Sequence, residues 1–533
     1  MFPSFSHHYA ALPDRMRAES APTPVTEPSL IVFNHSLAQA LGFDAAAFDP
    51  LKAAEVLSGS RLPDGVRPVA AAYAGHQFGN FVAQLGDGRA LLLGELPHAD
   101  GGLREVQLKG AGRTPFSRGG DGRAPIGPVL REYLVSEAMH ALGVPTTRAL
   151  AAVATGESVF RQLPEPGAVL TRVATSHLRV GTFQYFAVRG DKEALETLVA
   201  LAIERHYPDL GELPEPERPL ALLEAVVGRQ AALIAQWKGL GFIHGVMNTD
   251  NCALSGETID YGPCAFMDNF HPATVFSSID ERGRYAWDNQ PAIAQWNLAR
   301  LAETLLPLID ADQERAVEQA TRAIEAFSEH HERQWARVLR AKLGLCEAHE
   351  PSPGADLALG EALLDAMDQG SADFTLSFRR LALVLHNGES GESGESGESG
   401  ESGESGEPGE QGEQGEQGES AEPTQGSGEA TLRQGFERSQ MLNAWLPRWR
   451  ERLARESASS VELATRLEAA NPAVIPRNHQ VERVIRAAID DDDLAPFEHL
   501  LAAVTRPFDT PDDDALIAPP ARDQRVLRTF CGT

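Results

Sequence analysis

The change of sequence pattern near residue 190 most constrains how this chain can fold. Before it, apolar residues fall in short runs around glycines, as in Glu105–Lys109, which is typical of strands. After it, the long stretches 220–240 and 292–308 carry apolar residues at helical spacing. A chain of 533 residues is also too long for one compact core. We therefore expect an α+β protein with a strand-rich N-lobe followed by a helical C-lobe.

Composition divides the chain further. The segment from Gly388 to Ser420 repeats Gly-Glu-X and contains a single proline, Pro408, which excludes collagen. Because the repeat has no apolar side chains, we expect it to be disordered. The expected segments are an N-terminal extension (1–65), the N-lobe (66–190), the C-lobe (191–387), the acidic insertion (388–428), and a C-terminal helical region with a cysteine-containing tail (429–533).

The charge and cysteine content narrow the function classes. A net charge of −29 argues against nucleic acid or an anionic membrane as partner, since both require a basic surface. The 4 cysteines are too few and too scattered for a disulfide scaffold, which favours a reducing compartment. Neither a signal sequence nor an apolar stretch of about 20 residues is visible. We expect a cytoplasmic, monomeric protein.

The N-lobe contains a candidate phosphate-binding arrangement. Two apolar runs, 81–85 and 90–95, flank Gly86–Arg89, which predicts a hairpin around a glycine turn. Lys109 ends the next predicted strand, and Glu132 lies in a predicted helix over 128–139. Kinases hold nucleotide phosphates with a strand lysine that pairs with a helical glutamate.

The C-lobe contains a more specific motif. His244 precedes Asn251 by seven residues, and Asp260 then opens an Asp-Tyr-Gly triplet. This spacing matches the metal-binding loops of kinases, so Asn251 and Asp260 are predicted to bind Mg2+, with Mn2+ as the alternative. Together with the lobe order, the motif predicts a bilobal protein-kinase-like fold. Replacing Asp260 is expected to abolish activity and to leave stability nearly unchanged.

One position breaks the kinase pattern. Val246 stands where the catalytic aspartate belongs, and valine cannot accept a proton. Asp250 is the remaining candidate base in this loop. Arginines among glycines after Lys109, together with Arg172 and Arg179, predict a polyphosphate pocket, because arginine forks bind phosphate oxygens.

Four stretches resemble the selenoprotein O family: 73–79, 84–90, 107–118 and 244–251. The resemblance implies a kinase-like fold that transfers AMP from ATP to Ser, Thr or Tyr hydroxyls of proteins. ATP would bind in a flipped orientation that presents its α-phosphate. The resemblance implies Asp250 as proton acceptor, Asn251 and Asp260 as metal ligands, and nucleotide contacts from Gly86, Gly88, Arg89, Lys109, Asp121, Gly122, Arg172, Arg179 and Asp260.

The cysteine pairing and the reaction each have alternatives. Cys531 matches a cysteine that family members carry third from the end, but the stretch 273–280 lacks the cysteine that pairs with it in some members. Cys252 and Cys264 are the nearest candidates. The alternative functions are an ATP-dependent protein or small-molecule kinase and a nucleotide-binding pseudokinase scaffold, and UTP is an alternative donor.

Overall fold

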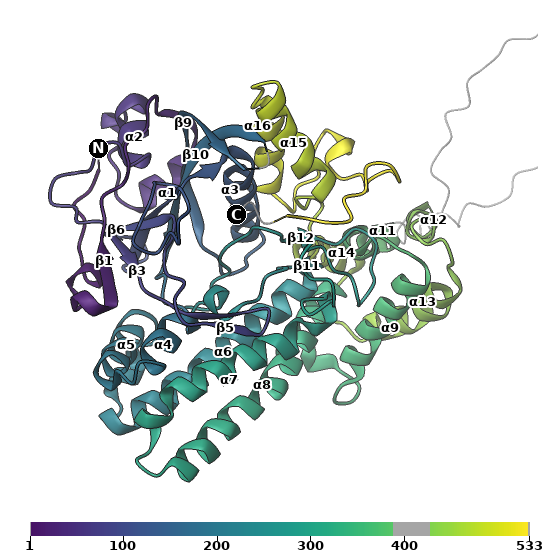
Figure 1. Cartoon of the computed structure of the whole chain (residues 1–533). Coiled ribbons are helices and arrows are strands. Elements are labelled where there is room, and N and C mark those ends of the chain that lie inside the picture. The colour runs from purple at the N-terminus through teal and green to yellow at the C-terminus, as the bar shows by residue number, and fades with distance from the viewer. Residues whose placement is uncertain (1, 162, 387–426, 531–533) are drawn as a thin grey trace, which may run out of the picture.

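The computed structural model describes residues 2–161, 163–386 and 427–530 (Figure 1). It is an α+β structure, as predicted, with a large antiparallel sheet in one part and long helices beside it. Among the described residues, no helix is both long and apolar enough to cross a membrane.

The main sheet is built from eight antiparallel strands. Seven of them follow one path, and β8 (Ala124–Pro125) pairs separately with β10. The first 65 residues supply the two outermost strands of that path, so they share the sheet with the segment that follows. The order along the path is β1 (Arg17–Glu19), β3 (Val69–Ala71), β6 (Ala90–Pro97), β7 (Leu103–Lys109), β10 (Pro164–Ala174), β9 (Arg148–Phe160) and β2 (Ser29–Phe33).

The predicted hairpin around Gly86–Arg89 is wrong. Strand β6 pairs instead with β3 and β7, so both of its edges are occupied. The run 81–85 contributes to β5 (Asn80–Val82), which pairs with β4 (Gly75–Gln77) in a small sheet of its own. The glycine turn therefore returns the chain from the β4–β5 hairpin to the main sheet. Glycine content signalled the turn, but it carried no information about the strand partner.

Helix α3 (Ile126–Ala141) lies between the sheet and two helices from the C-terminal region. On one side it packs on β9 and β10, and on the other on α15 (Asn478–Asp490) and α16 (Ala495–Val504) (Figure 1). Leu130 and Tyr133 share an apolar cluster with Val481 and Phe497. Arg131 also forms an ion pair with Glu482 of α15. The C-terminal region thus fixes the helix that carries Glu132.

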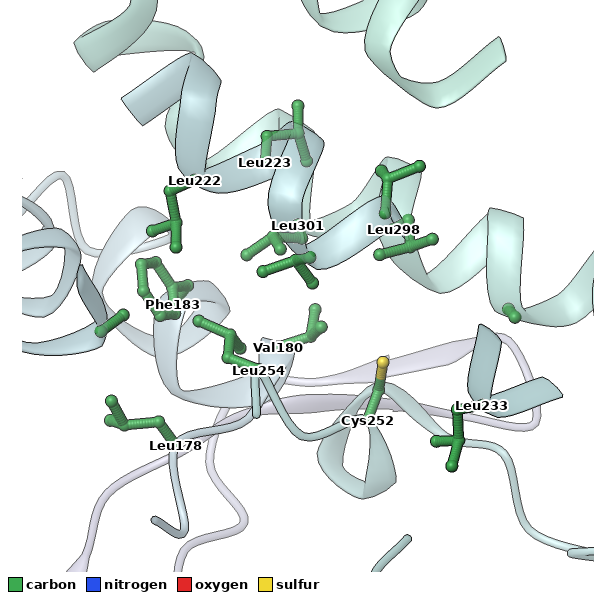
Figure 2. Close-up of a cluster of buried hydrophobic side chains, with 14 of the residues drawn as sticks. Leu178, Val180, Phe183, Leu222, Leu223, Leu233, Cys252, Leu254, Leu298 and Leu301 are labelled. Carbon is green, nitrogen blue, oxygen red and sulfur yellow. The ribbon is translucent and has the colours of Figure 1, made fainter. Parts of the chain in front are cut away.

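The helical part has its core directly behind the loop that follows α6. This core lies among α4 (Val180–Ala187), α5 (Lys192–His206), α6 (Arg218–Gly239), α7 (Gln290–Ile309) and α8 (Gln313–Lys342). Figure 2 shows Val180 and Phe183 of α4 near the leucines of α6 and α7, with Leu254 and Cys252 beside them. Burial of these side chains anchors residues 252–254, which directly follow Asn251.

A second apolar core holds the remaining helices together. Trp445 and Trp449 are fully buried in it and stack on each other. The expected insertion lies outside the described residues except at its end, where α12 already begins at Ser427. The helices around this core are α9 (Ala355–Gln369), α10 (Phe374–Arg379), α11 (Leu381–His386), α12 (Ser427–Gln434), α13 (Gln440–Leu453) and α14 (Ser460–Ala470), while α1 (His35–Ala40) and α2 (Pro50–Leu57) cover the sheet.

Candidate active site

The motif loop 244–264 is closed by a short pair of strands. Strand β11 (Phe242–Ile243) pairs with β12 (Ala265–Phe266), so the two ends of the loop lie side by side. His244 is buried, and its Nε2 lies 2.8 Å from the carbonyl oxygen of Ile259. Its ring stacks on Trp237, with 5.3 Å between the centroids. Burial lowers the pKa of His244, so this residue acts as a neutral tie that holds the loop in shape.

Backbone hydrogen bonds join this loop to the sheet part of the molecule. The amide of Val180 donates to Cys252 O at 2.9 Å, and the amide of Leu254 donates to Leu178 O at 3.0 Å. The amide of Thr258 donates to Pro145 O at 2.9 Å, just before β9. The chain segments on both sides of Asn251 and Asp260 are thereby fixed relative to β9 and β10.

Lys109 and Arg172 meet two carboxylates at the junction. Lys109 Nζ lies 2.6 Å from Glu132 Oε2 and 2.6 Å from Asp260 Oδ1. Arg172 Nη2 lies 2.6 Å from Glu132 Oε1 and 2.5 Å from Asp260 Oδ1. The predicted pairing of Lys109 with Glu132 is therefore present, and Asp260 completes the network.

Arg179 adds a third cation to this network. Its Nη1 donates to the backbone oxygen of Asp250 at 2.8 Å and lies 3.5 Å from Asp260 Oδ2. The guanidinium also stacks on the ring of Tyr73, 4.6 Å from its centroid. Lys109, Arg172 and Arg179 thus converge on Asp260, and the first two also pair with Glu132. Three cationic side chains gathered at one point can bind a polyanionic ligand.

The two shared carboxylates are held ionised. Burial would raise the pKa of Asp260, but Arg172, Lys109 and Arg179 keep it well below its usual range. Burial acts in the same way on Glu132, whose pKa is lowered by Arg172 and Lys109. Asp260 also has a φ of 64°, which is uncommon for a residue other than glycine. Residues held in this region cluster at functional sites.

Asp250 has the opposite electrostatic character. Its side chain is buried, and Oδ1 has no hydrogen-bond partner among the described residues. Burial, reinforced by the charge of Asp260, outweighs Arg179 and raises the pKa of Asp250 to about 6. A carboxylate with an unoccupied oxygen and a pKa near neutrality can accept a proton. Val246 is apolar and buried, so no such group stands at the kinase position.

The geometry of Asn251 suits a metal ligand. Its Nδ2 donates to the backbone oxygen of Val246 at 3.0 Å. This bond fixes the side-chain amide and turns its oxygen to the other side of the planar group. An amide oxygen and the ionised carboxylate of Asp260 are the ligand types that Mg2+ prefers. The donor set therefore fits a divalent cation.

The glycine turn is packed too tightly for side chains. A Cβ on Gly86 would lie 2.3 Å from the ring of Phe116, and a Cβ on Gly88 would lie 3.0 Å from Phe116 O. Gly86 has a φ of 71°, which L side chains rarely adopt. Half-buried Arg89 follows, and its backbone oxygen accepts from the amide of Gly110 at 2.7 Å. The turn is thus joined to the loop after Lys109.

Asp121 and Gly122 lie apart from the ion-pair network. Asp121 pairs with Arg161 at 2.8 Å, and its side chain is 42% exposed. Gly122 packs on the backbone of Gly112, where a Cβ would lie 2.0 Å from the carbonyl oxygen. The structure brings Lys109, Arg172, Arg179, Asp250 and Asp260 together, but no hydrogen bond or ion pair among the described residues joins Asp121 to this group.

The β4–β5 hairpin contributes residues that the sequence did not identify. A Cβ on Gly75 would lie 2.4 Å from Asp250 Oδ1, so the hairpin backbone covers this carboxylate. The amide of His76 donates to Thr249 Oγ1 at 2.7 Å. Gln77 is hydrogen-bonded to the side chain of Asp250, and this bond acts to lower the pKa of Asp250. These partners lie more than 170 residues apart in the chain, beyond the reach of any periodicity. Their only signal was the match of 73–79 to the family motif.

Comparison with known proteins decides the family. The profile described as Protein adenylyltransferase SelO matches residues 3–505. The chain belongs to the SelO family. The resemblance seen in the sequence is thereby confirmed, and this SelO chain is a nucleotidyltransferase.

Its relatives extend over nearly the whole chain. The protein nucleotidyltransferase YdiU of Bradyrhizobium sp. (strain BTAi1) is 53% identical over 530 residues, which cover 99% of both chains. The proteins of the same name from Rhodopseudomonas palustris (strain BisB5) and Rhizobium meliloti (strain 1021) are each 52% identical, again over 99% of both chains.

Proposed function

We propose that this SelO chain is a protein adenylyltransferase with a bilobal kinase-like fold. It transfers AMP from ATP to Ser, Thr or Tyr hydroxyls of proteins and releases pyrophosphate. The observation that carries the proposal is Asp250, a buried carboxylate with an unpartnered oxygen beside a cationic cluster, whereas the kinase base position holds Val246. Cytoplasmic location and a monomeric state stay predictions from the sequence.

The kinase-like assignment is supported by how the ion-pair network is assembled. Lys109 ends a sheet strand, Glu132 lies on the helix packed against that sheet, and Asp260 lies in the loop between β11 and β12. Kinases place a strand lysine, a helical glutamate and a metal-binding aspartate in the same relation.

The cationic cluster supplies the phosphate contacts. Lys109, Arg172 and Arg179 are ordered by their carboxylate partners, so little side-chain entropy is lost when phosphates bind. Charge-assisted hydrogen bonds of this kind contribute about 1.5–3 kcal/mol each. Contacts from three cations favour a triphosphate over a neutral ligand. Arg89 and the Gly86–Gly88 turn are proposed to contact the nucleotide from the side of the sheet.

Asn251 and Asp260 would hold Mg2+, or Mn2+ in its place. The cation would supply neutralisation of phosphate charge. Asp260 is suited to this ligand position because its three cationic neighbours keep it ionised. The Nδ2 bond to Val246 keeps Asn251 from turning its amide donor toward the cation.

The proposed transfer forms one phosphorus–oxygen bond and breaks another. The acceptor hydroxyl oxygen forms a bond to the α-phosphorus of ATP, and the bond from this phosphorus to the α–β bridging oxygen breaks. Pyrophosphate leaves with the electron pair of that bond. Asp250 takes the hydroxyl proton on its side-chain carboxylate. Its pKa of about 6 keeps it deprotonated at neutral pH and basic enough to act.

The released product tests this proposal. Purified chain is incubated with ATP, Mg2+ and an acceptor protein, and pyrophosphate and ADP are measured by coupled assays. We expect pyrophosphate, with about a hundredfold or greater loss in Asp250→Asn and no loss in Asp209→Asn, an exposed carboxylate. Release of ADP would identify a kinase, and nucleotide binding without either product would identify a scaffold. Faster turnover of UTP would assign the other donor.

A further inference from the structure

Beside the active-site loop lies a half-buried arginine that lacks a counter-ion. The guanidinium of Arg284 stacks on Trp296, 4.8 Å from the ring centroid. No carboxylate among the described residues forms an ion pair with it, and its Nε is buried without a hydrogen-bond partner there. Burying an unpaired charge is costly. The chain has a net charge of −29. An arginine without a carboxylate partner in such a chain is therefore a candidate for binding an anionic ligand.

The carboxylates of Asp280, Asp288 and Glu303 have other partners. Asp288 pairs with Lys238 at 3.0 Å. Asp280 accepts hydrogen bonds from the backbone amides of Arg284 and Tyr285, at 2.9 and 2.8 Å, so its oxygens serve the loop. Glu303 pairs with a second arginine, Arg300, at 2.8 Å.

Arg300, the partner of Glu303, lies at the same tryptophan ring. Its guanidinium lies over the ring of Trp296 as well, 5.1 Å from the centroid, and its Nε is also buried without a partner among the described residues. The rings of His76 and Trp296 lie perpendicular to each other, with 5.2 Å between their centroids. Burial and the charge of Arg300 lower the pKa of His76, so this histidine adds no charge at neutral pH. We call Arg284, Trp296 and Arg300 the Arg–Trp–Arg cluster.

This cluster is attached to the loop that carries Asp250. The hydroxyl of Tyr285, next to Arg284, donates to Asn248 Oδ1 at 2.8 Å. The same oxygen accepts from the amide of Phe78 at 3.0 Å, and Phe78 belongs to the hairpin whose Gly75 covers Asp250. The guanidinium of Arg284 also lies against Gly79, where a Cβ would be 3.7–3.8 Å away. The cluster and the catalytic carboxylate therefore share one hairpin.

We propose that the Arg–Trp–Arg cluster binds the carboxylate of an Asp or Glu residue in the protein substrate, close in sequence to the modified hydroxyl. Arginine suits this role because its planar fork binds a carboxylate through two hydrogen bonds. The stack on Trp296 holds the fork in place before the substrate binds. The cluster also gives a strongly acidic enzyme a local point of attraction for an acidic segment. This inference rests on the proposed function.

A binding assay tests the cluster without requiring turnover. Fluorescein-labelled peptides with one central Ser carry Glu, Gln, Lys or phosphoserine at each neighbouring position in turn, and their affinity is measured by anisotropy with ATP and Mg2+ present. We expect Glu at one or two positions to bind about tenfold more tightly than Gln, which corresponds to one charge-assisted bond. Arg284→Ala should remove this preference, and Arg284→Glu should shift it to Lys. Arg282→Ala, which removes an exposed arginine from the same loop, should leave the preference intact.

A second measurement separates this inference from the proposed function. The same peptides are incubated with α-labelled ATP. Transfer of label to the peptides by the wild-type chain, together with an unchanged Glu preference in Arg284→Ala, would overturn the inference and leave the transferase assignment intact. Failure of every peptide to accept label, together with an Arg284-dependent Glu preference in binding, would overturn the transferase and keep the anion subsite. Tighter binding of phosphoserine than of Glu would overturn the assignment to a carboxylate.

Discussion

Asp250→Asn should make the protein more stable at neutral pH while it abolishes transfer. The pKa of Asp250 is raised from its usual 3.8 to about 6 by burial and by the charge of Asp260. The folded state therefore binds this proton more tightly than the unfolded chain does. Stability contributed by the protonated group is fully present below about pH 4 and is lost as the pH rises through 6.

The size of the effect follows from the difference between the two pKa values. A gap of about two pH units, at about 1.4 kcal/mol per unit, corresponds to about 3 kcal/mol above pH 7. Asparagine keeps the shape of the side chain and carries no charge, so the variant escapes this cost. With an unfolding entropy of about 2.1 cal/mol/K per residue, a chain of this size should melt about 3 °C higher. At pH 4 the gain should fall below about 1 kcal/mol.

The assay is calorimetric melting of wild type, Asp250→Asn and Asp209→Asn between pH 4 and 8, all at one scan rate. The exposed control Asp209→Asn should show no comparable pH-dependent gain. In parallel, kcat/KM of wild type should rise about tenfold from pH 5 to 7, as the base loses its proton. A pH-independent melting difference, or an Asp250→Asn variant less stable than wild type at pH 8, would refute the electrostatic reasoning.

Three further predictions concern other parts of the chain. Asp260→Asn should lower transfer about a thousandfold; it should also destabilise the nucleotide-free protein by about 3 kcal/mol in urea, because Lys109, Arg172 and Arg179 lose a shared carboxylate. Full stability of that variant would show that the network contributes nothing to folding. Deleting 388–420 should leave melting temperature and transfer nearly unchanged, since the repeat has no apolar side chains, and a large loss in either would give the repeat a working role. If Cys531, which lies outside the described residues, forms an internal disulfide, oxidation should shift the non-reducing gel band, an effect absent in Cys531→Ser; peptide mapping that finds all thiols reduced would remove this switch.

The structure changes one expectation derived from the sequence and sharpens another. The sequence predicts that replacing Asp260 leaves stability nearly unchanged, whereas the ion pairs with three cations predict a loss of stability. The structure also shows which segment the C-terminal tail contacts, which the sequence did not predict. The backbone amide of Thr529 donates to Phe276 O at 2.7 Å, and the amide of Ser278 donates to Thr529 O at 2.9 Å. Both partners lie within 273–280, the stretch that lacks a cysteine.

The sequence was most informative where structure is local. Strand β7, helix α3 and the long helices α6 and α7 follow from the spacing of apolar residues, and each is present close to its predicted bounds. The pairing of Lys109 with Glu132 followed from a strand and a helix that are neighbours in the chain. In each case a few consecutive residues carried the signal.

Contacts between distant segments could not be predicted. The β4–β5 hairpin covers Asp250, α15 and α16 pack on α3, and Arg284 stacks on Trp296. Each contact depends on how whole elements pack, which no short window of sequence encodes. The glycine turn at 86–89 illustrates the limit, because its composition predicted a turn but not which strand would pair with β6.

Covalent label transfer tests the central claim most directly. The chain, an acceptor protein and Mg2+ are incubated in parallel with ATP labelled at the α-phosphate and with ATP labelled at the γ-phosphate, and protein is separated under denaturing conditions. Adenylyl transfer predicts stable label from α-labelled ATP, none from γ-labelled ATP, and loss of the label in Asp250→Asn. Label from γ-labelled ATP without label from α-labelled ATP would contradict the account and identify a kinase.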